Sequence, residues 1–113
     1  MTDYMVQYRR NLKAMNNAGK GTPQAGEIWW VSNLDGIKDR PVLILGHQGS
    51  TFMFRKCTSQ YSTAHPRDTI EDYYDAGLDK ATYVDPNVRT IPRSQLVRRM
   101  GRLSDLDCDK FGL

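Results

Sequence analysis

The chain has 113 residues, which is the size of one domain and leaves little room for a second. Charged residues at 26% and hydrophobic residues at 39% are ordinary for a globular protein, and no run of about 18 apolar residues could cross a bilayer. A net charge of +3 does not by itself identify a nucleic-acid binder, and the two cysteines give neither a disulfide framework nor a zinc-binding spacing. Residues 1–15 carry charges and lack the apolar segment of a secretory signal, so we expect a cytoplasmic protein with reduced thiols.

The first predicted element is an amphipathic helix over residues 2–18. Its apolar side chains recur at three- and four-residue spacing and are Tyr4, Met5, Tyr8, Leu12 and Met15. Three glycines and a proline follow within residues 16–26 and end the helix. We therefore expect residues 1–25 to form a helix and a Gly-rich linker, and residues 26–113 to form the folded domain. The helix is expected either to cover one end of that domain, which we favour, or to pack on a neighbouring subunit.

From residue 26 onward the pattern is one of short strands separated by turns. The predicted strands span residues 27–32, 41–45, 51–58, 69–74, 82–90 and 97–103. The run at 41–45 is apolar throughout, which is typical of a strand buried on both faces. In the strand at 51–58, alternation places three side chains opposite the other three, namely Phe52, Phe54 and Lys56 opposite Met53, Arg55 and Cys57.

Two short helices complete the predicted domain. Pro92 suits the first turn of a helix that ends at Leu96, and Ser104 is a favourable N-cap for a terminal helix that ends near Lys110. Short strands at close spacing with little helix between them favour a mainly β fold with α elements, built as a small antiparallel barrel.

Several short motifs occur at these strand positions. In chain order they are GEIW at 26–29, RPVLI at 40–44, KCTSQ at 56–60, VRTI at 88–91 and GRLS at 101–104. Together and in this order they resemble the MazF/PemK toxins of type II toxin–antitoxin systems, a family also related to CcdB. The resemblance covers residues 26–111 and leaves out the N-terminal helix.

The resemblance implies a fold, an activity and partners. The fold is an SH3-like antiparallel β-barrel that acts as a homodimer. The activity is that of an endoribonuclease, which cleaves single-stranded RNA or mRNA at short sequences, inhibits translation and is neutralised by a cognate antitoxin. Promoter DNA is bound only by the toxin–antitoxin complex. No metal or cofactor is implied, because the substrate's own 2′-OH is the nucleophile and no ion has to activate water.

The same resemblance makes Arg40 and Thr58 the catalytic residues. A guanidinium can fork onto a phosphate, and a threonine hydroxyl can donate to a phosphate oxygen. The structural alternatives are an arginine at a turn and a strand-terminal threonine bonded to its own loop. Further RNA contacts are expected at Ser59, Gln60, Trp29 and Arg89. Candidate platforms for stacked bases are Trp29, Trp30, Tyr61, Tyr73 and Tyr74. Because Trp29 and Trp30 are adjacent in a strand, one should lie in the core and the other be exposed.

The general acid or base stays open between two carboxylates. Many family members carry a glutamate in a longer loop before the catalytic arginine, where this chain has Asp35 in a short connection. Other members place an arginine and an aspartate on the strand before the VRTI motif, where this chain has Val84 and Asp85 followed by Pro86, so the arginine is missing and the acid is out of register. Neither histidine, His47 or His65, lies on a motif, so no metal site is expected.

Two other functions are compatible with the sequence. The C-terminal sequence Phe111-Gly112-Leu113 has the aromatic-glycine-aliphatic character of CcdB-like poisons of DNA gyrase. A third hypothesis is a catalytically silent module that binds nucleic acid or an antitoxin and has lost its base.

Overall fold

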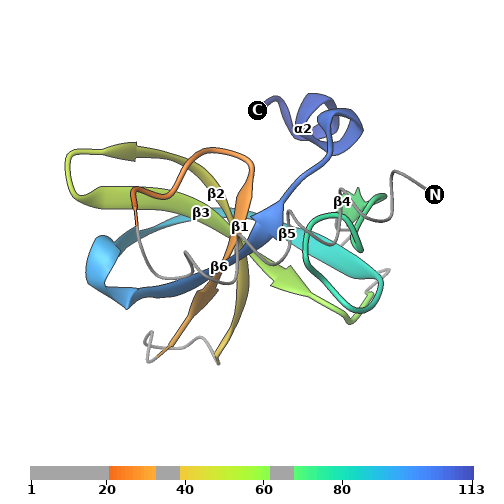
Figure 1. The fold of residues 1–113 in the computed structure, drawn as a ribbon, viewed down its shortest axis with the longest axis horizontal. Helices are drawn as coiled ribbons and strands as arrows, with labels where there is room; N and C mark the ends of the chain where they lie inside the picture. Colours follow the sequence, from red (N-terminus) through yellow and green to blue (C-terminus); the bar gives the residue numbers. More distant parts are fainter. Residues whose placement is uncertain (1–20, 33–38, 62–67) are drawn as a thin grey trace.

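The structure is a computed structural model and describes residues 21–32, 39–61 and 68–113. Its elements in chain order are β1 (Glu27–Val31), β2 (Arg40–Gln48), β3 (Thr51–Thr58), β4 (Asp68–Ile70), β5 (Thr82–Pro92), a 3-10 turn η1 (Arg93–Gln95), β6 (Leu96–Arg102) and α2 (Asp105–Phe111). The strands form one antiparallel sheet in the order β4-β5-β3-β2-β1-β6, and α2 lies near β4 and β5 (Figure 1). The helix predicted over residues 2–18 lies outside the described residues.

Most predicted strands are confirmed, with differences at their ends. Strand β3 has the predicted bounds, and the cap at Ser104 is confirmed because its hydroxyl accepts the backbone N–H of Asp107. The predicted helix from Pro92 to Leu96 is only the 3-10 turn η1. The predicted strand at 69–74 is reduced to the three residues of β4, because the backbone beyond Ile70 turns and its N–H groups bond to a side chain of α2.

The predicted closed barrel is not observed among the described residues. The sheet is bent by register shifts in the β1–β6, β2–β3 and β3–β5 pairs, as β-bulges do. Its two edges approach each other without forming a ladder: the turn after β4 packs its backbone on β6, where Gly77 and Gly101 meet. Because the edge strand β4 has only three residues, the segment that lies beside β6 is this turn and not a strand. The domain is therefore a mainly β, six-stranded sheet with one short C-terminal helix.

The sheet buries side chains on both faces. One core cluster contains Trp29, Val31, Val42, Ile44, Phe52, Phe54, Ile91 and Leu96. The other lies under the β4–β5 connection and α2 and contains Ile28, Leu43, Cys57, Ile70, Ala76, Leu78, Val84, Leu103 and Cys108. The apolar run of β2 contributes to both clusters, which confirms that this strand is buried on both faces. No helix among the described residues has the length and apolar character needed to cross a membrane.

Candidate active site

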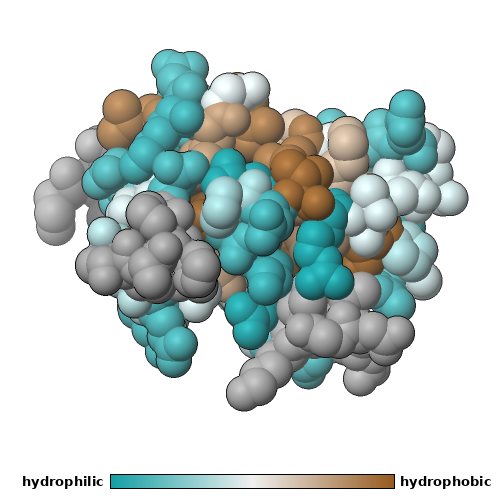
Figure 2. Space-filling view, turned by 180° about the vertical axis from the view of Figure 1, so that it is seen from behind, coloured by the Kyte–Doolittle hydropathy of each residue, from teal (hydrophilic) through white to brown (hydrophobic). Residues whose placement is uncertain are grey.

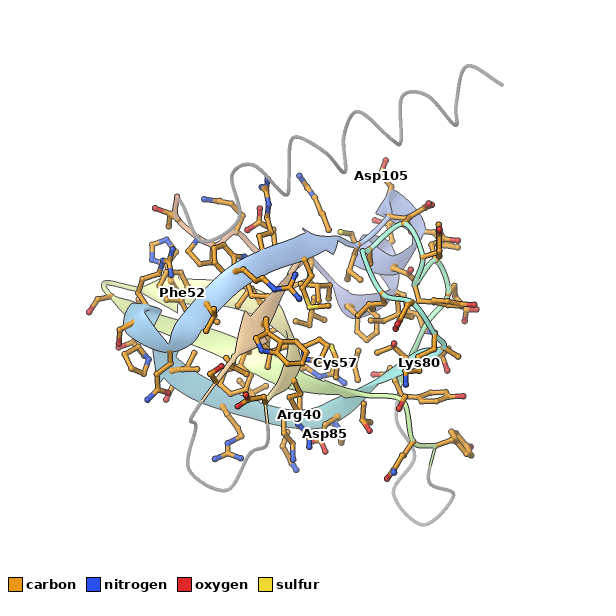
Figure 3. The ribbon with its side chains drawn as sticks, turned by 60° about the horizontal axis from the view of Figure 1, so that its bottom comes forward. Arg40, Phe52, Cys57, Lys80, Asp85 and Asp105 are labelled. Carbon is orange, nitrogen blue, oxygen red and sulfur yellow. The ribbon has the colours of Figure 1, made fainter. Side chains whose placement is uncertain are left out.

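A cleft of about 780 Å³ opens where β1 ends, β2 begins and β3 ends. Its walls come from these three strands, from β5 and β6, and from the turn between β4 and β5. Figure 3 shows Arg40 and Asp85 close to each other at this end of the sheet, with Cys57 and Lys80 nearby and Phe52 far from them. The cleft therefore contains both residues implied to be catalytic, Arg40 and Thr58, together with one of the two candidate bases.

Arg40 and Thr58 come from neighbouring strands. Val42 of β2 pairs with Lys56 of β3, so the same register continued by two residues sets Arg40 opposite Thr58. Neighbouring strands lie about 4.8 Å apart, and both side chains are half-buried in the cleft lining. The fold thus brings together two residues that are 18 positions apart in the sequence.

The hydroxyl of Thr58 is also bonded to its own loop. Its Oγ1 accepts the backbone N–H of Gln60 at 3.2 Å, which is the structural alternative considered for a strand-terminal threonine. A hydroxyl that accepts one hydrogen bond still has its own proton to donate. The bond to Gln60 therefore fixes the oxygen and leaves the O–H group available to an anion in the cleft.

The cleft lining is more cationic than anionic. Its charged side chains are the cations Arg40, Lys56, Lys80 and Arg98 and the carboxylates Asp79 and Asp85. Sequence reasoning missed Lys56 and Lys80, although Lys56 opens the same short motif that contains Thr58. In a cleft walled by protein, such an excess of positive charge attracts polyanions and is screened by salt.

Asp85 lies where β5 bulges away from β3. Arg55 of β3 pairs with Val88 and Cys57 with Val84, so extra residues of β5, among them Asp85, stand between the two pairs. The Arg55 Nε donates to the backbone oxygen of Asp85 at 2.7 Å, and Oδ1 of Asp85 accepts the N–H of Asn87 at 2.9 Å. The second candidate base, Asp35, lies outside the described residues.

The predicted RNA contacts are placed differently from one another. Ser59 and Gln60 are exposed and belong to the cleft lining, whereas Arg89 is exposed on β5 and does not belong to it. Trp29 is only 1% exposed, and its Nε1 donates to Glu27 at 2.9 Å, so its ring is covered and cannot stack on a base in this chain. Trp30 is the half-buried neighbour that lines the cleft. Trp29 is therefore the core tryptophan, and the other tryptophan, expected to be exposed, is half-buried.

The remaining aromatic candidates lie outside the cleft lining. Tyr61 stacks against Tyr83, with ring centroids 5.4 Å apart, and Tyr73 packs against the core. Tyr74 is 73% exposed. The C-terminal Phe111 also packs against the core, with the Arg55 guanidinium 5.4 Å from its ring centroid.

Cys57 is a buried residue of the cleft lining, and its thiol has low reactivity. The thiol is 1% exposed, and burial raises its pKa to about 12 despite the opposing charges of Arg55 and Arg40. Because the thiolate is the reactive form, such a thiol is a poor nucleophile near neutral pH. Both cysteines are free and buried, in accord with the expectation of reduced thiols.

The turn that forms the far wall of the cleft is held by α2. The fully buried carboxylate of Asp107 accepts the backbone N–H groups of Glu71 at 2.9 Å and Asp72 at 2.8 Å. Further along the turn, a Cβ at Gly77 would lie 2.1 Å from the Met100 oxygen, so only a glycine allows the turn to approach β6 so closely. These contacts place Leu78, Asp79 and Lys80 at the cleft.

Comparison with known proteins reveals a likeness of fold. No protein-family model matches the chain, and no curated protein matches it. Among solved structures, an endoribonuclease from mycobacterial species, in complex with its cognate antitoxin, is similar with a TM-score of 0.61 and 17% sequence identity. The match covers 80% of this chain and 85% of that chain. The six-stranded sheet that carries the cleft is thus built on the same fold as that endoribonuclease.

Proposed function

We propose that the chain is an endoribonuclease of the MazF/PemK type that cleaves single-stranded RNA without a metal ion. The observation that carries the proposal is the convergence of Arg40, Thr58 and Asp85 on one cationic cleft. The fold shared with an antitoxin-bound endoribonuclease supports it. The finer features of the family, including an SH3-like barrel, a homodimer and neutralisation by an antitoxin, are part of the same proposal.

In the proposed reaction, Arg40 and Thr58 bind the scissile phosphate. The guanidinium forks onto the non-bridging oxygens, where negative charge grows as the phosphorus becomes five-coordinate. The Thr58 hydroxyl donates to one of the same oxygens. The backbone of Arg40 is held by its pairing with Val31 of β1, and the Thr58 oxygen by its bond to Gln60, so little reorganisation of these groups is needed during the reaction.

Asp85 is the proposed general base. Its carboxylate takes the proton of the 2′-OH while the new bond from O2′ to phosphorus forms and the bond from phosphorus to O5′ breaks. The departing O5′ takes a proton from solvent, the protonated Asp85 returns its proton to solvent, and the products carry a 2′,3′-cyclic phosphate and a 5′-OH. The Arg55 bond to the backbone of Asp85 holds the bulge that presents this carboxylate.

Cleavage of a long single-stranded RNA in EDTA tests the proposal. The wild-type protein should give discrete fragments that end in cyclic phosphate. Arg40→Ala, Thr58→Val and Asp85→Asn should each lower the rate by about 10²- to 10³-fold, the usual cost of removing one transition-state partner. Lys110→Ala removes an exposed cation of α2 that lies outside the cleft lining and should leave the rate unchanged.

Two results would reject the mechanism. Strict dependence of cleavage on Mg²⁺ would show that the reaction requires a metal ion, contrary to the proposed metal-independent attack by the substrate's 2′-OH. Full activity of the Arg40→Ala variant would remove the phosphate-binding role on which the reaction rests.

A further inference from the structure

Trp30 is the one aromatic side chain among the described residues that line the cleft. Its neighbour Trp29 is buried and fixed by Glu27, so β1 directs one indole into the core and leaves the other half-buried at the cleft. A tryptophan that keeps part of its ring in solvent forgoes some hydrophobic stabilisation. Such a ring is available to contact a ligand.

The position of Trp30 is set by pairing on both sides of β1. It pairs with Pro41 of β2 on one side and with Arg98 of β6 on the other. Arg40, the residue before Pro41, pairs with Val31, so Trp30 and the proposed phosphate-binding arginine belong to consecutive cross-strand pairs of β1 and β2, and both line the cleft. The carbon of the Arg98 guanidinium lies 5.9 Å from the centroid of the Trp30 ring.

Four groups of the cleft lining therefore come from four adjacent strands of the sheet. Thr58 and Arg40 come from β3 and β2, Trp30 from β1, and Arg98 from β6. Proteins that bind single-stranded nucleic acid combine cations, which follow the backbone, with aromatic rings, on which bases stack. The cleft lining has that composition, with one aromatic ring and cations from β2, β3 and β6. Seen from behind (Figure 2), the described surface carries hydrophobic residues beside hydrophilic ones.

We infer that Trp30 is the stacking platform for the nucleobase next to the phosphate bound by Arg40 and Thr58, and that Arg98 binds the adjoining phosphate. The inference rests on the proposed function, since it places a substrate of that reaction in the cleft. Stacking on an indole accepts any base, because every base has a π face. Trp30 therefore contributes affinity and orients the scissile bond, and any preference for particular bases arises elsewhere.

Binding of uncleavable RNA by variants at Trp30 tests this inference. The probes are a labelled pool of random-sequence 2′-O-methyl RNA 20-mers, which lack the nucleophile, and a labelled abasic ribose-phosphate 20-mer, which lacks bases. Trp30→Ala should weaken binding of the base-containing pool by about 5- to 100-fold, as expected for the loss of one stacked base. Binding of the abasic 20-mer should change by less than about twofold. Tyr74→Ala removes an exposed aromatic ring outside the cleft lining and should change neither affinity.

Tryptophan fluorescence supplies a second measurement. The chain contains two tryptophans, so Trp30→Phe leaves Trp29 as the only indole. RNA should quench the emission of the wild-type protein and leave that of the Trp30→Phe variant unchanged, while the phenylalanine retains most of the affinity by stacking. Circular dichroism confirms that each variant is folded, and Trp30→Phe keeps the test valid if Trp30→Ala does not fold.

The possible results separate this inference from the proposed function. If Trp30→Ala weakens binding of both probes equally, or if quenching persists in Trp30→Phe, the stacking role is wrong even when natural RNA is cleaved. If the wild-type protein binds neither probe, the stacking role is also wrong. If base-dependent binding follows Trp30 but natural RNA stays intact in EDTA, the stacking role stands and the ribonuclease proposal fails.

Discussion

The close approach of β6 to the turn after β4 predicts that Gly101→Ala damages the cleft. A Cβ at Gly101 would lie 2.2 Å from the Ala76 oxygen and 2.5 Å from the Ala76 carbonyl carbon. Ordinary contacts begin at 3.4 Å, so the turn would have to move by roughly 1 Å. The atoms met are backbone, which cannot rotate out of the way as the end of a side chain can. The turn must therefore leave β6 as a unit, and Leu78 and Lys80 must move with it.

Overpacking of this kind costs about 1–3 kcal/mol of unfolding free energy. In a domain of this size, that corresponds to a fall in Tm of about 4–8 °C for each kcal/mol. Leu78 is 6% exposed and belongs to the core, so displacing the turn disturbs packing as well as the cleft. Urea unfolding should therefore give a lower midpoint for Gly101→Ala. The affinity for the 2′-O-methyl RNA pool should fall in the same protein, because Lys80 no longer faces the other cations.

Gly49→Ala is the matched control. Gly49 lies between β2 and β3 with a φ of +60°, and a Cβ there meets nothing within 4 Å. Its substitution costs only the left-handed backbone conformation, about 1–2 kcal/mol, and leaves the cleft intact. RNA affinity should then stay at the wild-type value. The reasoning fails if Gly101→Ala is as stable as the wild type, or if Gly49→Ala weakens RNA binding as much as Gly101→Ala does.

Three further predictions follow from buried groups. Asp107→Ala leaves two backbone N–H groups of the turn without their acceptor and should cost about 2–5 kcal/mol in urea unfolding, against about 1 kcal/mol for loss of the cap in Ser104→Ala. The Cys57 thiol, whose pKa is about 12, should not react with a thiol reagent at pH 8 until the protein is unfolded. In the unfolded chain the same thiol ionises near pH 9.0, so the free energy of unfolding should fall as the pH rises from 9 to 12. Cys57→Val should reduce this dependence of stability on pH. Arg55→Leu releases the backbone of Asp85 and should shift the pH profile of RNA cleavage, whereas unchanged pH dependence would show that the bulge needs no such support.

The sequence was sufficient for elements whose signals are local. Strand β3 lies between two turns and alternates clearly, and both of its ends were predicted correctly. The cap at Ser104 was recognised because a serine before a run with acidic residues in its first turn favours a helix start. By contrast, the extent of β4 depends on Asp107, a residue more than 30 positions away, which bonds the backbone just beyond the strand. No local pattern contains that information.

The same distinction applies to the cleft. The resemblance pointed to Arg40 and Thr58, and the register of β2 and β3 sets them opposite each other. Alternation predicted that Trp29 and Trp30 face opposite ways, but both faces of the sheet carry a core, so only the three-dimensional structure shows that Trp30 lies at the cleft. Lys80 was missed because it enters from a turn that only the tertiary structure brings to the cleft. Closure of the barrel was overestimated, since three-residue strands and backbone-to-backbone packing leave no simple signature in the sequence.

The pairing of β1 with β6 also bears on how the protein is made. Glu27 pairs with Arg102, so the two strands meet only after nearly all the intervening chain has been synthesised. Contacts between such distant segments slow folding, because a long loop must close before they form. On the ribosome, a nascent chain that has emerged as far as β5 can form the β2–β3 hairpin but lacks the wall that carries Arg98 and Met100. An unfinished polypeptide therefore has no complete cleft, and the proposed activity requires that β6 has been made.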